Sequence, residues 1–181
     1  MTRRCLRRII GTSFGGPFCA LVCVCLFIAS TAGAAFASGT IFDVRLVRVI
    51  DGDSLEVSIN GRKETVRLCG IDTPEYKQEF GKEARNYTAR FCRGKKLRLE
   101  FDKDKRDKHR RLLAYVWHGA EFLNRQLVEN GLALAVYYKP NGKYYKTFKA
   151  IEKKAKKERI GFWKQGGLKM TPYKWRRTHR R

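Results

Sequence analysis

Residues 67–75 read Arg-Leu-Cys-Gly-Ile-Asp-Thr-Pro-Glu, which places one arginine and two carboxylates at the end of an expected β-strand. Side chains alternate along a strand, so Arg67 and Asp72 begin on opposite faces, and the glycine between them leaves room for a bulge. Pro74 stops the strand and turns Glu75 back toward its end. We therefore expect a cation and two anions to gather at one point, an arrangement suited to chemistry on phosphate.

Two flanking stretches supply further charged groups. Residues 51–54 read Asp-Gly-Asp-Ser, and residues 107–111 read Asp-Lys-His-Arg-Arg. Taken alone, each motif has an ordinary explanation, because Asp-Gly-Asp is usually a turn and the Thr-Pro-Glu of residues 73–75 is usually a helix start. The order and spacing of all three along one chain favour a functional interpretation.

Three ordered motifs resemble the staphylococcal nuclease (thermonuclease) family. They are Val-Ile-Asp-Gly-Asp-Ser at 49–54, the stretch at 67–75, and Arg111 followed by Leu-Ala-Tyr at 113–115. The resemblance runs from about residue 43 to residue 163. Three motifs in one order rarely agree by chance, so the resemblance guides what we expect of the fold and the chemistry.

Apolar periodicity divides the chain after residue 41 into strands and helices. It predicts strands at 42–50, 55–59, 66–71, 96–101 and 112–117, and helices at 79–91, 122–130 and 145–159. The Asn-Gly pair at residues 60–61 predicts a hairpin turn. Several α+β arrangements fit this order, and the resemblance implies one of them, a five-stranded OB-fold Greek-key β-barrel with three helices.

The chain divides into three parts on composition. Residues 1–37 read as a signal peptide, residues 38–165 as the staphylococcal nuclease-like domain, and residues 166–181 as a basic tail. The tail contains Trp175 among cations, so it is either an extra nucleic-acid contact or a half-docked end. We favour the half-docked end.

The resemblance implies a calcium ion held by Asp53, Asp72 and the backbone carbonyl of Thr73, with waters completing its shell. Hard divalent cations prefer such oxygen ligands. In the family the second aspartate of the Asp-Gly-Asp pair binds the metal, so we assign Asp51 to the turn.

The resemblance also implies the catalytic groups. Glu75 matches the glutamate that acts on the attacking water, as general base or as orienting acceptor. Arg67 and Arg111 match the arginines that bind the scissile phosphate, for which a planar guanidinium is well suited. The alternative for Arg67 is an ion pair with Glu100 or Asp102 on the strand face.

Two residues stand at family positions that contact the substrate, and a third lies near such a position. Lys108 matches a lysine near a terminal phosphate, although it is one lysine among many. His109 replaces a phosphate-contacting tyrosine and can still donate a hydrogen bond. The family's base-stacking tyrosine falls at Val136 here, which leaves Tyr137 and Tyr138 as nearby candidates. For Tyr138, core packing is an equal alternative to stacking on a base. Arg110 departs from the family's glycine, so the loop either takes a different path or offers a cation that competes with Arg111.

Charge points to a polyanionic partner. Lys and Arg number 40 against 17 Asp and Glu, which gives a formal net charge of +23, or +19 without the four arginines of the leader. Nucleic acid is the first candidate partner, ahead of an anionic membrane or an acidic glycan. We expect no protein partner and a monomeric protein.

The combined expectation is a secreted, calcium-dependent endonuclease that acts on DNA and RNA. The 3′-phosphate ends that we expect of its products are implied by the resemblance alone. The first alternative is a non-catalytic OB-fold that binds nucleic acid, although the acidic and arginine positions of the enzymes are present here. A basic membrane-associated protein is the second alternative.

Cysteines carry little information about function. Four of the six lie in the leader, and Cys69 and Cys92 have no metal-ligand spacing, which excludes a zinc module. In an exported chain these two could form a disulfide, or they could be small buried hydrophobic residues. We favour the second interpretation.

The leader predicts export. Arg3, Arg4, Arg7 and Arg8 precede an apolar run at residues 18–29, and the Ala-Phe-Ala of residues 35–37 fits a signal-peptidase site. The protein is then secreted or periplasmic. A retained membrane anchor is the weaker alternative, because the run is short for a bilayer span.

We predict that the exported protein begins at Ser38, because the small residues at positions 35 and 37 place the cleavage there. Mass spectrometry of the N-terminus checks this prediction. An intact Met1 on exported protein would contradict cleavage.

Overall fold

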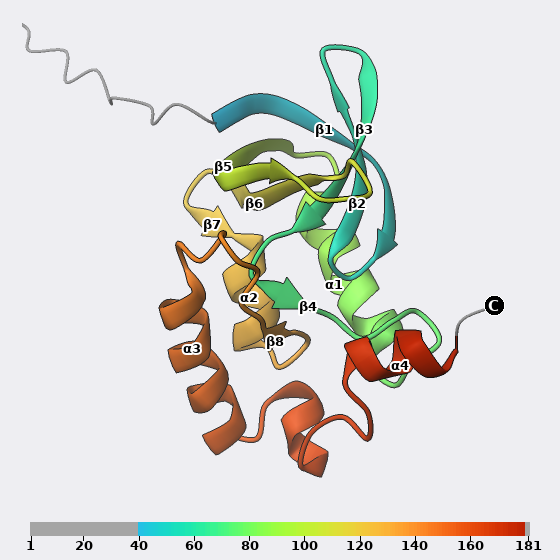
Figure 1. Ribbon diagram of the computed structural model, residues 1–181, viewed down its shortest axis with the longest axis vertical. Helices are drawn as coiled ribbons and strands as arrows, with labels where there is room; N and C mark the ends of the chain where they lie inside the picture. Colours follow the sequence, from blue (N-terminus) through green and yellow to red (C-terminus); the bar gives the residue numbers. More distant parts are fainter. Residues whose placement is uncertain (1–39, 180–181) are drawn as a thin grey trace, which may run out of the picture. The chain divides into compact units, whose positions relative to one another are not determined.

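The computed structural model describes residues 40–179, and the leader expected at residues 1–37 lies outside them (Figure 1). Five strands form a closed sheet: β1 (Thr40–Asp51), β2 (Ser54–Ile59), β3 (Arg62–Leu68), β5 (Lys96–Arg106) and β6 (Leu112–His118). They lie in the order β3-β2-β1-β5-β6, and parallel pairing of β3 with β6 closes the sheet into a barrel. The predicted five-stranded barrel is confirmed.

Shorter strands and the helices lie around one end of the barrel (Figure 1). The short strands are β4 (Ile71–Asp72), which pairs with β8 (Leu134–Ala135), and β7 (Glu121–Phe122), which pairs with β6. The helices are α1 (Gly81–Cys92), α2 (Leu123–Glu129), α3 (Tyr145–Lys157), a 3₁₀-helix (Gly161–Gln165) and α4 (Pro172–Thr178). The first three α-helices are those predicted, and α4 is a fourth, formed by the basic tail. Within residues 40–179, no helix has the length and apolar character needed to cross a bilayer.

The barrel and the helices share one hydrophobic core. Leu55 and Val57 of β2 alternate into it, α1 adds Ala84 and Phe91, and α3 adds Phe148. Burying each large apolar side chain stabilises the fold by about 1.5–3 kcal/mol. This shared core fixes the helices against the barrel and so fixes the segments that run between them.

The expected strand at residues 66–71 is two strands that separate at Gly70. Gly70 has a φ of +78°, and a Cβ there would lie 2.9 Å from a ring carbon of Phe148. Before it, the amide of Cys69 still bonds to β6, while the carbonyl of Gly70 already accepts from Val136 at 3.0 Å. The chain therefore leaves the barrel at this glycine and enters the β4–β8 pair.

The turn between β1 and β2 packs against the end of β4. A Cβ on Gly52 would lie 2.7 Å from both the Cβ of Ala84 and the Oγ1 of Thr73, so only glycine allows this approach. The Gly52 carbonyl accepts a hydrogen bond of 2.6 Å from Thr88 on α1. Residues 51–54 and 72–73 are thereby held side by side.

Cys69 and Cys92 are both free and buried, which confirms that they act as small hydrophobic residues. Burial raises the pKa of the Cys92 thiol to about 12. At neutral pH this side chain therefore stays protonated, in the form that is poorly nucleophilic.

We predict that Gly70→Ala lowers the free energy of unfolding by about 2–4 kcal/mol, because it combines a left-handed backbone with a clash against Phe148. Gly61→Ala is the matched control, since Gly61 also has a φ of +78° but has no atom within 4 Å of the new Cβ. Its cost should be about 1 kcal/mol. Urea denaturation measures both, and equal costs would show that the close approach to Phe148 is unimportant.

Candidate active site

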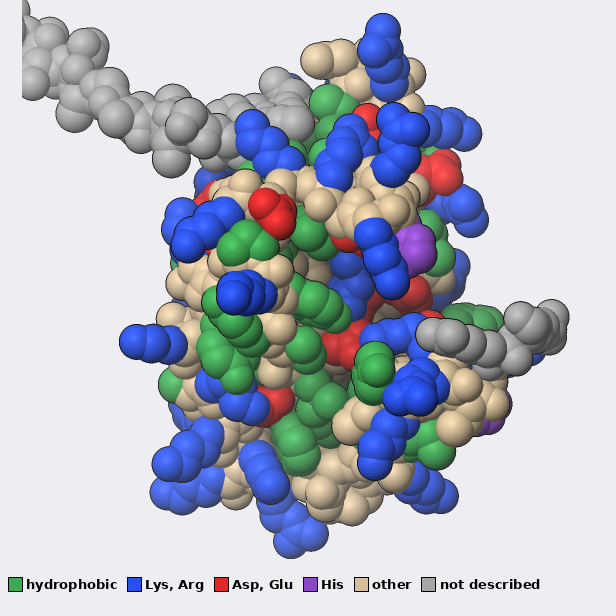
Figure 2. Space-filling view, in the orientation of Figure 1, with side chains coloured by type: hydrophobic (Ala, Val, Ile, Leu, Met, Phe, Trp, Pro, Cys, Tyr) green, Lys and Arg blue, Asp and Glu red, His purple; other side chains and the backbone are tan. Residues whose placement is uncertain are grey.

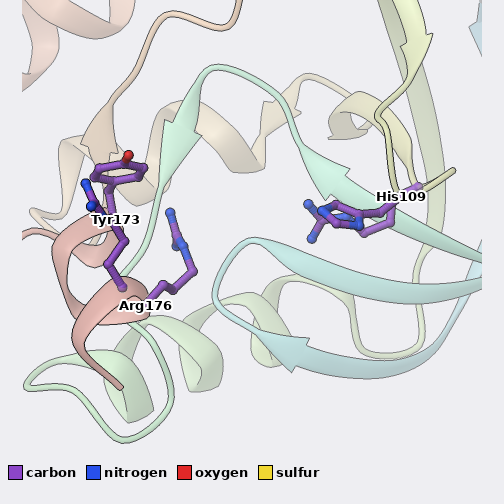
Figure 3. A pocket seen from close by; sticks show the side chains of 5 residues that line it. His109, Tyr173 and Arg176 are labelled. Carbon is purple, nitrogen blue, oxygen red and sulfur yellow. The ribbon is translucent and has the colours of Figure 1, made fainter. Parts of the chain in front are cut away.

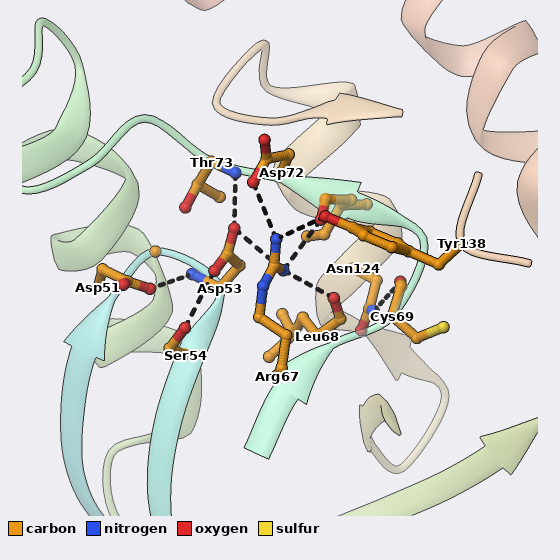
Figure 4. A network of polar contacts seen from close by, with 12 residues as sticks. Asp51, Asp53, Ser54, Arg67, Leu68, Cys69, Asp72, Thr73, Asn124 and Tyr138 are labelled. Atoms are coloured by element: carbon orange, nitrogen blue, oxygen red, sulfur yellow. Dashed lines mark hydrogen bonds and ion pairs between the residues drawn. The ribbon is translucent and has the colours of Figure 1, made fainter. Parts of the chain in front are cut away.

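Arg67 lies buried at the end of β3 between two aspartates (Figure 4). Its Nη1 is 3.1 Å from Oδ2 of Asp53, and its Nη2 is 2.8 Å from Oδ1 of Asp72. Nη1 also donates to the backbone carbonyls of Leu68 and Ile71, each at 2.9 Å. One guanidinium thus joins β3, β4 and the β1–β2 turn.

The break at Gly70 is what brings Arg67 and Asp72 together. These residues are five positions apart, so an unbroken strand would turn them to opposite faces. Because the chain leaves the barrel at Gly70, Asp72 returns to the side of Arg67. The alternative ion pair with Glu100 or Asp102 is wrong, since Glu100 pairs with the Lys143 side chain and Asp102 accepts from the Tyr115 hydroxyl and the Lys143 amide.

The electrostatic surroundings of Arg67 keep it charged. Burial alone would lower the pKa of its guanidinium, but the negative charges of Asp53 and Asp72 raise that pKa above its ordinary value. Burial, reinforced by the charge of Asp53, raises the pKa of Asp51 to about 7. Oδ1 of Asp51 accepts from the Asp53 amide at 3.1 Å, so this aspartate stabilises the turn.

Asp53, Asp72 and Thr73 form a group of oxygen-bearing residues. Oδ2 of Asp53 accepts a hydrogen bond of 2.7 Å from the Thr73 amide, and the buried Oγ1 of Thr73 has no hydrogen-bond partner in the described part of the chain. Among residues 40–179, no three His, Cys, Asp or Glu side chains are grouped closely enough to hold a metal. A cation here would need backbone or water oxygen besides the two carboxylates, which is a donor set that calcium accepts.

Glu75 and Asp72 are joined by an arginine that the sequence did not reveal. Nη1 of Arg176, on α4, is 2.6 Å from Oε1 of Glu75. The same guanidinium holds Asp72, with Nη1 3.1 Å from Oδ1 and Nη2 3.0 Å from Oδ2. The Thr-Pro pair at residues 171–172 could have predicted a helix start. No sequence signal pairs position 176 with position 72.

The acids lie in a recess of a basic surface. Figure 2 shows Asp and Glu atoms grouped in the middle of one face, with Lys and Arg side chains around them. A polyanion drawn to this surface would meet the carboxylates at the centre of the basic region.

Arg111 lines a cavity of about 530 Å³ next to these acids. The other lining residues are His109, Tyr173, Arg176 and Arg177. Figure 3 shows His109 on the loop after β5, across the cavity from Tyr173 and Arg176 of α4. Nε of Arg111 is 2.8 Å from Oδ2 of Asp107, which holds the side chain in place. Since Arg176 also binds Asp72 and Glu75, the cavity adjoins the acidic group.

Arg110 takes the backbone conformation that glycine adopts readily. Its φ is +65°, and its carbonyl accepts a hydrogen bond of 2.6 Å from Arg106. Arg110 lines a second cavity, which it shares with Arg111, and is absent from the lining of the cavity beside α4. The loop therefore keeps a left-handed turn at this position despite the substitution, and Arg111 alone of the two faces α4.

Tyr138 borders the site and is not part of the core. Its hydroxyl accepts a 3.3 Å hydrogen bond from Nη2 of Arg67, and its side chain is 36% exposed. Lys108 is exposed on the loop after β5. Contact of Lys108, His109 or Tyr138 with a nucleotide stays a prediction.

Comparison with known proteins gives consistent matches. Residues 65–165 match the family model described as staphylococcal nuclease homologue. The chain is similar to the thermonuclease of Staphylococcus hyicus, with 41% identity over 125 residues that cover 66% of this chain and 74% of the relative. It is similar to the thermonuclease of Staphylococcus intermedius, with 41% identity over 124 residues covering 65% and 74%. Endonuclease YncB of Bacillus subtilis is 41% identical over 133 residues, covering 69% and 63%. The family match includes positions 67, 72, 75 and 111 and ends before α4.

We predict that Arg67→Met lowers the free energy of unfolding by about 3–5 kcal/mol in a chelating buffer, because Asp53 loses its buried cationic partner. Urea denaturation measures the loss. Arg85→Met is the control, since Arg85 is an arginine of α1 that donates to the carbonyl of Val49 and lies over the ring of Tyr76, with no ion pair described for it. Similar small losses in both variants would show that the aspartates do not depend on the Arg67 charge.

Proposed function

The chain belongs to the staphylococcal nuclease family and is a nuclease, and from this premise we propose that it is a calcium-dependent endonuclease of DNA and RNA. We propose that it leaves 3′-phosphate ends and is exported from the cell that makes it. The observation that carries the proposal is the grouping of Arg67, Asp53, Asp72 and Glu75 beside the cavity lined by Arg111.

Asp53, Asp72 and the carbonyl of Thr73 would hold the calcium ion. The turn that only Gly52 allows brings Asp53 to Thr73, and Arg67 forms ion pairs with both Asp53 and Asp72. When bound, calcium polarises the phosphate and lowers the energy of the charge that accumulates on its oxygens. Two carboxylates, one carbonyl and water are oxygen ligands of the hard type that this ion prefers.

Arg67 and Arg111 would bind the phosphate from two sides. Charge builds on the phosphate oxygens as water attacks, and a guanidinium meets that charge with paired hydrogen bonds that need no change of protonation. Arg67 is held rigidly by four hydrogen-bond and ion-pair contacts to β3, β4 and the turn. Arg111 is held by Asp107. Such preorganised cations stabilise a transition state without moving when the charge forms.

Glu75 would act on the water. Its half-buried carboxylate lies two residues after Thr73 in the chain, close to the proposed metal ligands, so it is suited to accept the proton of a water that attacks phosphorus. The new bond joins the water oxygen to phosphorus, and the bond to the 5′ oxygen breaks. The phosphate then remains on the 3′ side.

The substrate class follows from charge and surface. A net charge of +23 favours nucleic acid of any sequence, since phosphate contacts carry no base information. The exposed ring of Tyr138 beside Arg67 offers a face on which a base could stack. Little sequence preference is therefore expected.

We predict that Glu75→Gln and Arg111→Lys each lower the turnover of single-stranded DNA by about a hundredfold or more, while the fold persists. Glu83→Gln and Arg125→Lys are matched controls, because both residues are exposed and neither lies at the proposed site. A gel assay with calcium or with a chelator measures cleavage. Binding of DNA without cleavage in calcium would replace the proposal with a non-catalytic OB-fold.

A further inference from the structure

The tail helix α4 is built onto the nuclease domain as a separate addition. It lies after residue 165, where the family match ends. Pro172 stands at its first turn and the Thr171 hydroxyl accepts from the Lys174 amide, so the helix has its own start signal. The segment before it is tied down, because Gln78 donates to the Met170 carbonyl and Glu79 accepts from the Lys169 amide. These contacts hold α4 over the acidic group.

The guanidinium of Arg176 binds the carboxylate of Asp72, a proposed calcium ligand, and that of Glu75. Arg176 donates two parallel hydrogen bonds of 3.1 and 3.0 Å to the two carboxylate oxygens of Asp72, and a third of 2.6 Å to Glu75. This is the bidentate geometry that makes arginine a strong partner for a carboxylate. Every hydrogen bond described for this side chain goes to one of these two acids.

Calcium and Arg176 compete for Asp72 because three of its roughly four acceptor positions are already occupied and because both carry positive charge. A carboxylate oxygen accepts about two hydrogen bonds or metal bonds. Oδ1 of Asp72 already accepts from Arg67 at 2.8 Å and from Arg176 at 3.1 Å, and Oδ2 accepts from Arg176 at 3.0 Å. A divalent ion on Asp72 would also lie within a few ångströms of the Arg176 charge, and like charges at that distance repel strongly.

Arg67 and Arg176 differ in this respect. Arg67 is buried and is fixed by backbone carbonyls, so it stays when other partners change. Arg176 comes from a seven-residue helix, and its side chain is 38% exposed. Of the two arginines on Asp72, Arg176 is the one that can leave.

We propose that Arg176 is an intramolecular competitor of calcium, so that the tail helix occupies the cation site until the ion displaces it. This inference rests on the proposed function, since it takes Asp72 and Asp53 as calcium ligands. When Arg176 leaves the acids, the adjoining cavity receives it. That cavity is lined by Arg111, His109 and Arg177, and a phosphate of the nucleic acid bound there would satisfy the displaced guanidinium. Calcium and nucleic acid therefore both favour the state in which Arg176 has left Asp72 and Glu75, which we call the open state.

The expected change in calcium affinity depends on the fraction of molecules in which Arg176 covers Asp72. An apparent dissociation constant rises by the inverse of the fraction of molecules in which the site is open. If Arg176 covers Asp72 in about nine molecules of ten, its removal strengthens calcium binding by about tenfold.

The test is calcium titration calorimetry on the folded protein at fixed ionic strength, with wild type, Arg176→Ala and Arg177→Ala. Arg177 is the matched control, because it is on the same helix and carries the same charge but contacts the ring of Tyr173. Because Arg177 also lines the cavity proposed for phosphate, the titration contains no nucleic acid. We expect Arg176→Ala to bind calcium about tenfold more tightly than wild type and Arg177→Ala to stay within about twofold.

Arg176→Lys keeps the charge without the bidentate hydrogen bonds, so its calcium affinity should lie between those of wild type and Arg176→Ala. It also serves as the test variant if alanine disturbs α4.

The outcomes separate this inference from the proposed function. If all four proteins bind calcium with the same affinity, Arg176 is not a competitor, and the proposed function stands. If Arg176→Ala melts at a lower temperature but binds calcium as Arg177→Ala does, Arg176 only fixes the helix, and the inference is overturned. Weaker DNA binding by Arg176→Ala with unchanged calcium affinity would instead make it a substrate-binding residue. If none of the proteins binds calcium, the proposed calcium dependence fails, and the inference fails with it.

Discussion

A buried guanidinium between two aspartates is the constraint on which the rest of this molecule depends. Arg67 binds Asp53 and Asp72, which lie on separate segments, and it also holds the carbonyls on either side of the β3–β4 break. Without its charge, two carboxylates would be close together in a region of low dielectric, which is costly. Gly52 and Gly70 serve the same arrangement, because one permits the turn to approach Thr73 and the other lets β4 leave the barrel.

Arg67 and Arg176 both compensate the negative charge of Asp72. The first belongs to the barrel and compensates the buried side of Asp72, and the second comes from the tail and covers the side that faces the cavity. A nuclease site needs carboxylates to hold a cation and arginines to hold a phosphate. The carboxylates repel one another and the phosphate, and the arginines repel one another and the cation. In this protein the acids are few and recessed, and the cations surround them (Figure 2).

Local patterns predicted the fold well. Alternation and helical spacing place the five barrel strands and three helices near their observed bounds, and the Asn60-Gly61 pair forms the expected hairpin, with φ of +49° and +78°. The sequence could suggest a bulge at Gly70, but the full separation of β3 from β4 depends on pairing with β8, more than 60 residues later. Arg176 was missed for a similar reason, since its partner lies 104 positions away and is reached only through tertiary packing. Periodicity reports local structure, and the completed site depends on contacts that it does not contain.

The parallel pairing of β3 with β6 has a consequence for when the protein becomes active. In this seam Arg67 stands opposite Leu113, two residues after Arg111, so closing the barrel is the step that aligns both arginines. The contact joins segments more than 40 residues apart and must overcome the loop entropy between them. A partly folded chain, with the seam still open, could have Arg67 beside its acids but would have Arg111 on a separate segment. The two arginines of the proposed active site would thus come together only when the barrel closes.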